Sequence, residues 1–138
     1  MSQTTIPTKR LFLRPFEDTD GPAYSEALPY SFAITLRTNG QLIGHCRLGP
    51  ERDSPNHAGI AFTLNQDYWG QGYATEAVRA LLRYGFEQQN MQYLFAECQS
   101  ENLAAKRVLE KVGMQPTEPI TRDSTNAASL RFGLQSPD

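Results

Sequence analysis

The sequence predicts an α+β fold, in which a mixed, largely antiparallel twisted sheet is flanked by helices on both faces and holds a central β-α-β unit. Two observations predict it. The dipeptide Asn39-Gly40 lies between two apolar runs, which is a strong signal for an antiparallel hairpin. Apolar residues recur at helical spacing over 74–86, between two strand-like runs, which indicates a parallel β-α-β unit. The chain of 138 residues has the length of one ordinary domain, and we expect 1–138 to form one domain.

The first strand and the hairpin come from the N-terminal part of the chain. Residues 10–16, RLFLRPF, alternate basic and apolar side chains as far as Pro15, which predicts a strand at or near a sheet edge. Residues 18–30 contain one glycine and two prolines and leave room for at most two helical turns. The hairpin is expected over 31–48.

The second part of the chain alternates strands and helices. Strand-like runs at 57–64 and 93–98 flank the first helix. A second helix over 103–112 is preceded by an asparagine, a good N-cap, and followed by a glycine, a good C′ residue. Residues 115–126 are polar and interrupted by two prolines, after which 128–134 can form a closing strand.

The composition indicates which kinds of binding partner and which cellular location to expect for this protein. The formal net charge is −2 and the basic residues are scattered, so we expect no nucleic-acid partner. No segment resembles a signal peptide or a membrane span, so we expect no membrane contact and a cytoplasmic location. Cys46 and Cys98 match no metal spacing, and we interpret them as reduced core thiols. The sequence does not decide whether the chain forms a homodimer.

The segment 68–77, YWGQGYATEA, joins a predicted strand to the N-terminus of the first helix. Gly70 and Gly72 lack a Cβ, so the backbone there can curl closely around an anion. The free N–H groups of 72–75 would point at that anion, the helix dipole would attract it, and the hydroxyl of Thr75 could donate as well. This arrangement suits a diphosphate.

The glycine turn has three other interpretations. The glycines could make only a tight turn, with Trp69 and Tyr73 packing as core aromatics. A P-loop is disfavoured because the segment lacks the Lys and Ser/Thr that end that motif. A dinucleotide fingerprint is disfavoured because Thr75 stands where the third glycine would be.

The order of a strand, WGQGYATEAV, a helix, a strand and ENLAAKRVLEKVGM resembles the GNAT superfamily of acetyl-coenzyme A-dependent N-acetyltransferases. Within it, the sequence is similar to the branch that includes the ribosomal-protein N-terminal acetyltransferases. The opening TKRLFLRPF is similar too, so the resemblance covers 8–114. It implies a GNAT-like sheet and acetyl-CoA as the acyl donor, with no metal.

The resemblance also implies which residues bind the cofactor. The family pattern, Gln or Arg, two residues, Gly, one residue, then Gly or Ala, falls on the glycine turn, with Trp69 as a departure at its first position. The amides of 70–75 would bind the pyrophosphate, and the strand at 62–64 would pair with the pantetheine arm. Ala105 stands where the family usually has Ser. The implied cofactor-binding residues are Phe62, Thr63, Leu64, Gly70, Gln71, Gly72, Tyr73, Ala74, Thr75 and Asn102.

Acetyl transfer needs a neutral amine, donors for an oxyanion, and a proton for the departing thiolate. Relatives in this branch often have a Glu at the position of Gly59, and many members use a Tyr from the helix at 102–113, which has none here. His57 and Glu97 are the remaining catalytic candidates, because each lies on a strand expected to flank the acyl group. Either could instead be an ordinary surface residue. A backbone amide near Leu64 could polarise the thioester, and positioning alone could catalyse transfer.

These features favour an enzyme that transfers acetyl from acetyl-CoA directly to a primary amine, on a protein or peptide N-terminus or on a small molecule. The short stretch at 21–30, where relatives place two helices, predicts an open acceptor groove. The alternative is a catalytically weak or inactive coenzyme A-binding sensor or scaffold. A third reading, a purely structural protein, predicts that nothing binds at the glycine turn.

Overall fold

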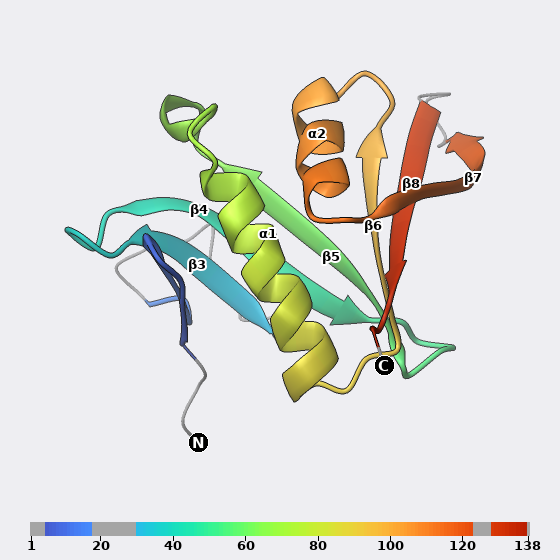
Figure 1. Ribbon diagram of the computed structural model, residues 1–138, viewed down its shortest axis with the longest axis horizontal. Coiled ribbons are helices and arrows are strands. Elements are labelled where there is room, and N and C mark those ends of the chain that lie inside the picture. Colours follow the sequence, from blue (N-terminus) through green and yellow to red (C-terminus); the bar gives the residue numbers. More distant parts are fainter. Residues whose placement is uncertain (1–4, 18–29, 123–127, 138) are drawn as a thin grey trace.

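The computed structural model describes residues 5–17, 30–122 and 128–137 (Figure 1). Its strands form one eight-stranded sheet in the order β1-β2-β3-β4-β5-β6-β8-β7. The strands are β1 (Ile6–Pro7), β2 (Leu11–Arg14), β3 (Ser31–Leu36), β4 (Leu42–Pro50), β5 (His57–Leu64), β6 (Tyr93–Gln99), β7 (Gln115–Arg122) and β8 (Ala128–Gln135). The helices are η3 (Gln66–Tyr68), α1 (Tyr73–Arg83), η4 (Tyr84–Gln88) and α2 (Leu103–Lys111).

The sheet is antiparallel except at its centre, which confirms the predicted fold class. Strands β5 and β6 run parallel and are joined through α1, as expected for the β-α-β unit. In the described ranges α1 and α2 both lie on the same face of the sheet, so the helices predicted for the other face are not seen among the described residues (Figure 1). Residues 18–29, which make up most of the stretch with room for two helical turns, fall outside the described residues.

Helix α1 follows from its amphipathic sequence. Its apolar positions repeat every three or four residues and are buried against the sheet, whereas Arg79 and Arg83 are exposed. The helix continues into the π-helical segment η4, whose Tyr84 packs edge-on against Phe32 of β3, with ring centroids 5.3 Å apart. No helix in the described part of the chain is long and apolar enough to cross a membrane.

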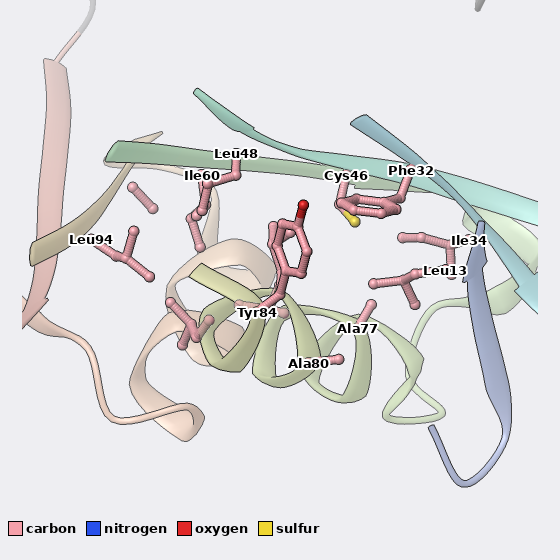
Figure 2. Packing of buried hydrophobic residues seen from close by; sticks show 14 of the residues in the cluster. Leu13, Phe32, Ile34, Cys46, Leu48, Ile60, Ala77, Ala80, Tyr84 and Leu94 are labelled. Atoms are coloured by element: carbon pink, nitrogen blue, oxygen red, sulfur yellow. The ribbon is translucent and has the colours of Figure 1, made fainter. Parts of the chain in front are cut away.

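The hydrophobic core lies between α1 and the sheet (Figure 2). Every second side chain of a strand points toward the helix, so each central strand contributes two or three core residues. Helix α2 contributes Leu109, which is fully buried. Figure 2 labels ten of the core residues, namely Leu13, Phe32, Ile34, Cys46, Leu48, Ile60, Ala77, Ala80, Tyr84 and Leu94.

The predicted hairpin is confirmed, and two edge strands are additions to the prediction. Gly40 has φ +73° and donates its N–H to the carbonyl of Leu36 across the turn between β3 and β4. Strand β1 has only two residues, too few to give a periodic signal. Strand β7 accommodates two prolines because it is an edge strand whose register is broken between Thr117 and Thr121.

Candidate functional site

Strands β5 and β6 separate in the middle of the sheet. Their last paired residues are Ile60 and Ala96, yet β5 continues to Leu64 and β6 to Gln99. Beyond that pair each strand is still hydrogen-bonded on its outer side, β5 to β4 and β6 to β8. The inner edges therefore offer backbone N–H and C=O groups that no neighbouring strand uses within the described residues. Such an edge can bind an extended ligand that carries amides.

The glycine turn follows η3 and begins α1. Gly70 and Gly72 have φ +76° and +84°, the left-handed conformation that favours glycine. Gly72 is the N-cap of α1, and no side chain caps the helix there. The amides of the first helical turn are therefore free to bind a ligand, and the helix dipole favours an anion at this position.

A cleft of about 400 Å³ connects the sheet gap, the glycine turn and α2. It is lined by all of the predicted cofactor-binding residues except Gln71, namely Phe62, Thr63, Leu64, Gly70, Gly72, Tyr73, Ala74, Thr75 and Asn102. Seven further residues that the cofactor prediction did not include also line it, namely Tyr68, Trp69, Ala104, Ala105, Arg107, Val108 and Lys111.

Two polar side chains of the predicted set are partly engaged by the protein itself. The Gln71 side chain turns back toward the Asp67 carbonyl, 3.5 Å away, and does not line the cleft. Asn102 caps α2, because its Oδ1 accepts the N–H of Ala105 at 3.0 Å. The cap uses only the amide oxygen, so the Asn102 nitrogen is left for a ligand.

Trp69, the departure from the family pattern, has a structural role in the turn. Its indole N–H donates to the Leu64 carbonyl at 2.8 Å, which ties the glycine turn to the end of β5. The residue is nevertheless 55% exposed and forms part of the cleft wall. An exposed aromatic ring that is held by such a bond keeps its orientation before a ligand arrives.

Arg10 holds the glycine turn in place from the other side. Its guanidinium donates to Glu76 Oε1 at 2.7 Å and to the carbonyl of Gln71 at 3.0 Å. The same group lies 4.3 Å from the centre of the Tyr73 ring, a cation–π distance. Thr8 also donates to the Glu76 carboxylate. The turn between β1 and β2 is thereby fixed to the N-terminus of α1.

The Glu76 carboxylate predicts how stability depends on pH. Burial alone would raise its pKa, but hydrogen bonds from Thr8 and Arg10 and the Arg10 charge outweigh burial, so the net pKa is lowered. A lowered folded-state pKa stabilises the protein above the unfolded-state value and is lost as pH falls through the folded-state value. We expect acidification below about pH 4 to destabilise the wild type more than Glu76→Gln in urea unfolding. Parallel losses in both proteins would contradict this.

The structure does not bring His57 to the cleft. This residue begins β5 and Leu64 ends it, so seven residues of strand, roughly 23 Å, separate His57 from the cleft end. Its imidazole lies 3.8 Å from Glu51 and 5.2 Å, centroid to centroid, from the ring of Tyr93. His57 lies on the predicted strand, β5, but at the end of that strand that is farther from the cleft.

Glu97 lies beside the sheet gap without lining the cleft. It is the first residue of β6 beyond the last pair with β5, and it follows the buried Ala96. Successive side chains alternate between the two faces, so Glu97 points away from the helices. Its carboxylate lies 3.2 Å from the guanidinium of Arg131 on β8, in a pair that is about half exposed.

An aromatic ring takes up the space that a side chain at Gly59 would need. A Cβ at Gly59 would lie 3.0 Å from Cε2 of Phe95, its partner on β6. Arg131 covers Phe95, with its guanidinium 4.2 Å from the ring centre. A longer side chain at Gly59 would therefore have to displace this ring.

The remaining candidate features outside the cleft are few. A second cavity of about 380 Å³ lies between 6–9 and residues of α1 and η4 within 76–88. Burial raises the pKa of the Cys46 thiol to about 12, and both cysteines are free. Among the described residues, no group of three or more His, Cys, Asp or Glu side chains could hold a metal ion.

Two solved structures share this fold. A GNAT-family acetyltransferase from Bacillus anthracis matches 98% of this chain and 100% of its own, with a TM-score of 0.85 and 23% identity. RimL, a ribosomal L7/L12 α-N-protein acetyltransferase in complex with coenzyme A, matches 96% of this chain and 98% of its own, with a TM-score of 0.77 and 13% identity.

Sequence comparison gives the family. The model of the acetyltransferase (GNAT) domain matches residues 23–115, and the chain belongs to this family. The uncharacterized N-acetyltransferase YnaD of Bacillus subtilis is 37% identical over 84 residues, which are 61% of this chain and 49% of YnaD. The chain spans about half the length of such curated relatives.

Proposed function

We propose that the chain is an N-acetyltransferase that moves acetyl from acetyl-CoA directly to a primary amine, on a protein or peptide N-terminus or on a small molecule. One observation carries the proposal: a single cleft joins an unpaired strand edge to uncapped helix amides. Coenzyme A has the matching two-part chemistry, because a pantetheine arm with two amides continues into a pyrophosphate. The coenzyme A complex of RimL supports this assignment.

In this proposal the residues around the gap act mainly by positioning. The 61–64 edge of β5 binds the pantetheine arm, and a backbone N–H near Leu64 polarises the thioester carbonyl. The amine nitrogen attacks the carbonyl carbon, the carbon–sulfur bond breaks, the attacking nitrogen loses a proton to a base, and the thiolate takes up a proton from solvent. In this proposal the attack is direct and forms no covalent intermediate with the enzyme. Holding both reactants together supplies a large part of the rate.

Glu97 is the residue we assign to accept the proton of the amine, directly or through water. Acetyl-CoA occupies the helix side of the gap in this proposal, so the amine approaches from the opposite face, where Glu97 points. The pair with Arg131 is about half exposed, which leaves the carboxylate accessible to water.

A matched pair of variants separates the two catalytic candidates. We expect Glu97→Gln to lower kcat about 100-fold, the usual contribution of a general base, while the Kd for acetyl-CoA stays unchanged. His57→Gln should keep the wild-type kcat, because His57 lies at the far end of β5. Steady-state kinetics with one accepted amine measure both. Equal kcat values for Glu97→Gln and wild type would leave catalysis to positioning alone.

A coenzyme A-binding sensor or scaffold is the second candidate, and two observations favour it. Gly59 cannot act as a base, and Ala105 lacks the hydroxyl that relatives use at this position. The two functions share the cleft and differ only in turnover.

Isothermal titration with acetyl-CoA, followed by chromatographic assay of coenzyme A release, tests the proposal. Release is measured with and without a panel of primary amines and N-terminal peptides. Chromatography is preferable to a thiol reagent because Cys98 is only partly buried. Amine-dependent release supports the transferase. Binding without release supports the sensor or scaffold, and absence of binding overturns both.

A further inference from the structure

The coenzyme A cleft contains a pair of positive side chains that the glycine turn does not need. Arg107 and Lys111 are the charged side chains among the described residues that line the cleft, and no carboxylate lines it with them. They are four residues apart on α2, so they lie on the same face of that helix. Ala104 and Val108, which also line the cleft, lie on that face too.

Neither Arg107 nor Lys111 has a polar partner for its side chain in the described part of the chain. No ion pair or side-chain hydrogen bond is formed by Arg107 or Lys111 there, and both residues are exposed. The Lys111 backbone is anchored instead, because its carbonyl accepts a bond from Arg79 of α1 at 3.0 Å. Arg10, the basic residue nearest the glycine turn, is already bonded to Glu76 and to the Gln71 carbonyl.

The glycine turn and the two cations suit different anionic groups of the ligand. The helix amides and dipole at Gly70–Thr75 already suit the pyrophosphate, and that segment contains no Lys or Arg. Coenzyme A carries one more phosphate, a monoester on the 3′-oxygen of its ribose. A doubly charged monoester pairs well with a guanidinium and an ammonium group that share one helix face.

We propose that Arg107 and Lys111 bind the 3′-phosphate of coenzyme A, so that the protein selects coenzyme A over its 3′-dephospho form. This inference rests on the proposed function, because it assumes coenzyme A as the ligand. It adds the residues that decide which form of the cofactor is accepted.

Titration of four proteins with two ligands tests the assignment. The proteins are the wild type, Arg107→Gln, Lys111→Gln and the control Lys106→Gln, which removes the same charge from the same helix outside the cleft. The ligands are coenzyme A and 3′-dephospho-coenzyme A. We expect each cleft variant to raise the Kd for coenzyme A about 10-fold, the loss of one charge-assisted bond, and to leave the Kd for the dephospho ligand unchanged. Lys106→Gln should bind both ligands as the wild type does.

Every other result decides against the assignment. Equal weakening for both ligands would place the two side chains on the pyrophosphate. Unchanged affinity for both ligands would leave them in solvent. Either result, with normal binding by the wild type, overturns this inference and leaves the proposed function intact. Failure of the wild type to bind coenzyme A overturns the proposed function as well.

Discussion

Replacing Gly72 with valine is expected to abolish acetyl-CoA binding, with a loss of about 100-fold or more in affinity. Gly72 has φ +84°, which a β-branched residue does not tolerate, and its Cβ would lie 3.2 Å from Nη2 of Arg10. The turn would have to rearrange, and the amides of the first turn of α1 would no longer converge on one anion. Isothermal titration with acetyl-CoA measures the loss.

Gly40→Val is the matched control for backbone strain. Gly40 has a similar φ of +73° in the β3–β4 turn, and a Cβ there meets nothing within 4 Å. This variant should lose stability through the same unfavourable conformation, yet bind acetyl-CoA as the wild type does. Near-normal affinity in Gly72→Val would show that the glycine turn does not hold the pyrophosphate.

Gly44→Ala is expected to destabilise the fold by about 3 kcal/mol or more, at the upper end of the usual cost of overpacking. Gly44 pairs with Leu64 at the cleft end of β5, and a Cβ there would lie 2.2 Å from the carbonyl oxygen of Thr63. That oxygen belongs to the backbone, so β4 and β5 must move apart. We expect weaker acetyl-CoA binding as well, because the displaced strand forms one wall of the cleft.

Gly49→Ala serves as the control on the same strand. A Cβ at Gly49 would have its nearest neighbour at 3.9 Å, an ordinary contact. Urea unfolding should give Gly49→Ala a free energy within about 0.5 kcal/mol of the wild type. If Gly44→Ala were equally mild, the close approach of β4 to the end of β5 would not constrain the cleft.

Much of the fold could be predicted because its signals are local. The Asn39-Gly40 turn, the periodicity of α1 and the two boundaries of α2 each depend on a few neighbouring residues. Strand β7 was missed because the pairing of an edge strand depends on β8, and its two prolines argue against a strand.

The parts of the site that are built from backbone groups could be predicted from the sequence. The parts that depend on side chains from different helices or strands were harder to predict. The glycine turn and the 62–64 edge needed only the order of strand, turn and helix. Arg107 and Lys111 were missed because their position depends on how α2 packs against α1, although their spacing of four was visible. His57 could have been discounted, since the turn follows the opposite end of its strand.

The most direct test of the central claim is an amide ¹H–¹⁵N NMR titration of the protein with acetyl-CoA. We expect the largest shifts on Phe62–Leu64 and on Gly70–Thr75, the two backbone segments beside one cleft. Shifts concentrated instead at 6–9 and 79–88, around the second cavity, or an unchanged spectrum at saturating ligand, would contradict it.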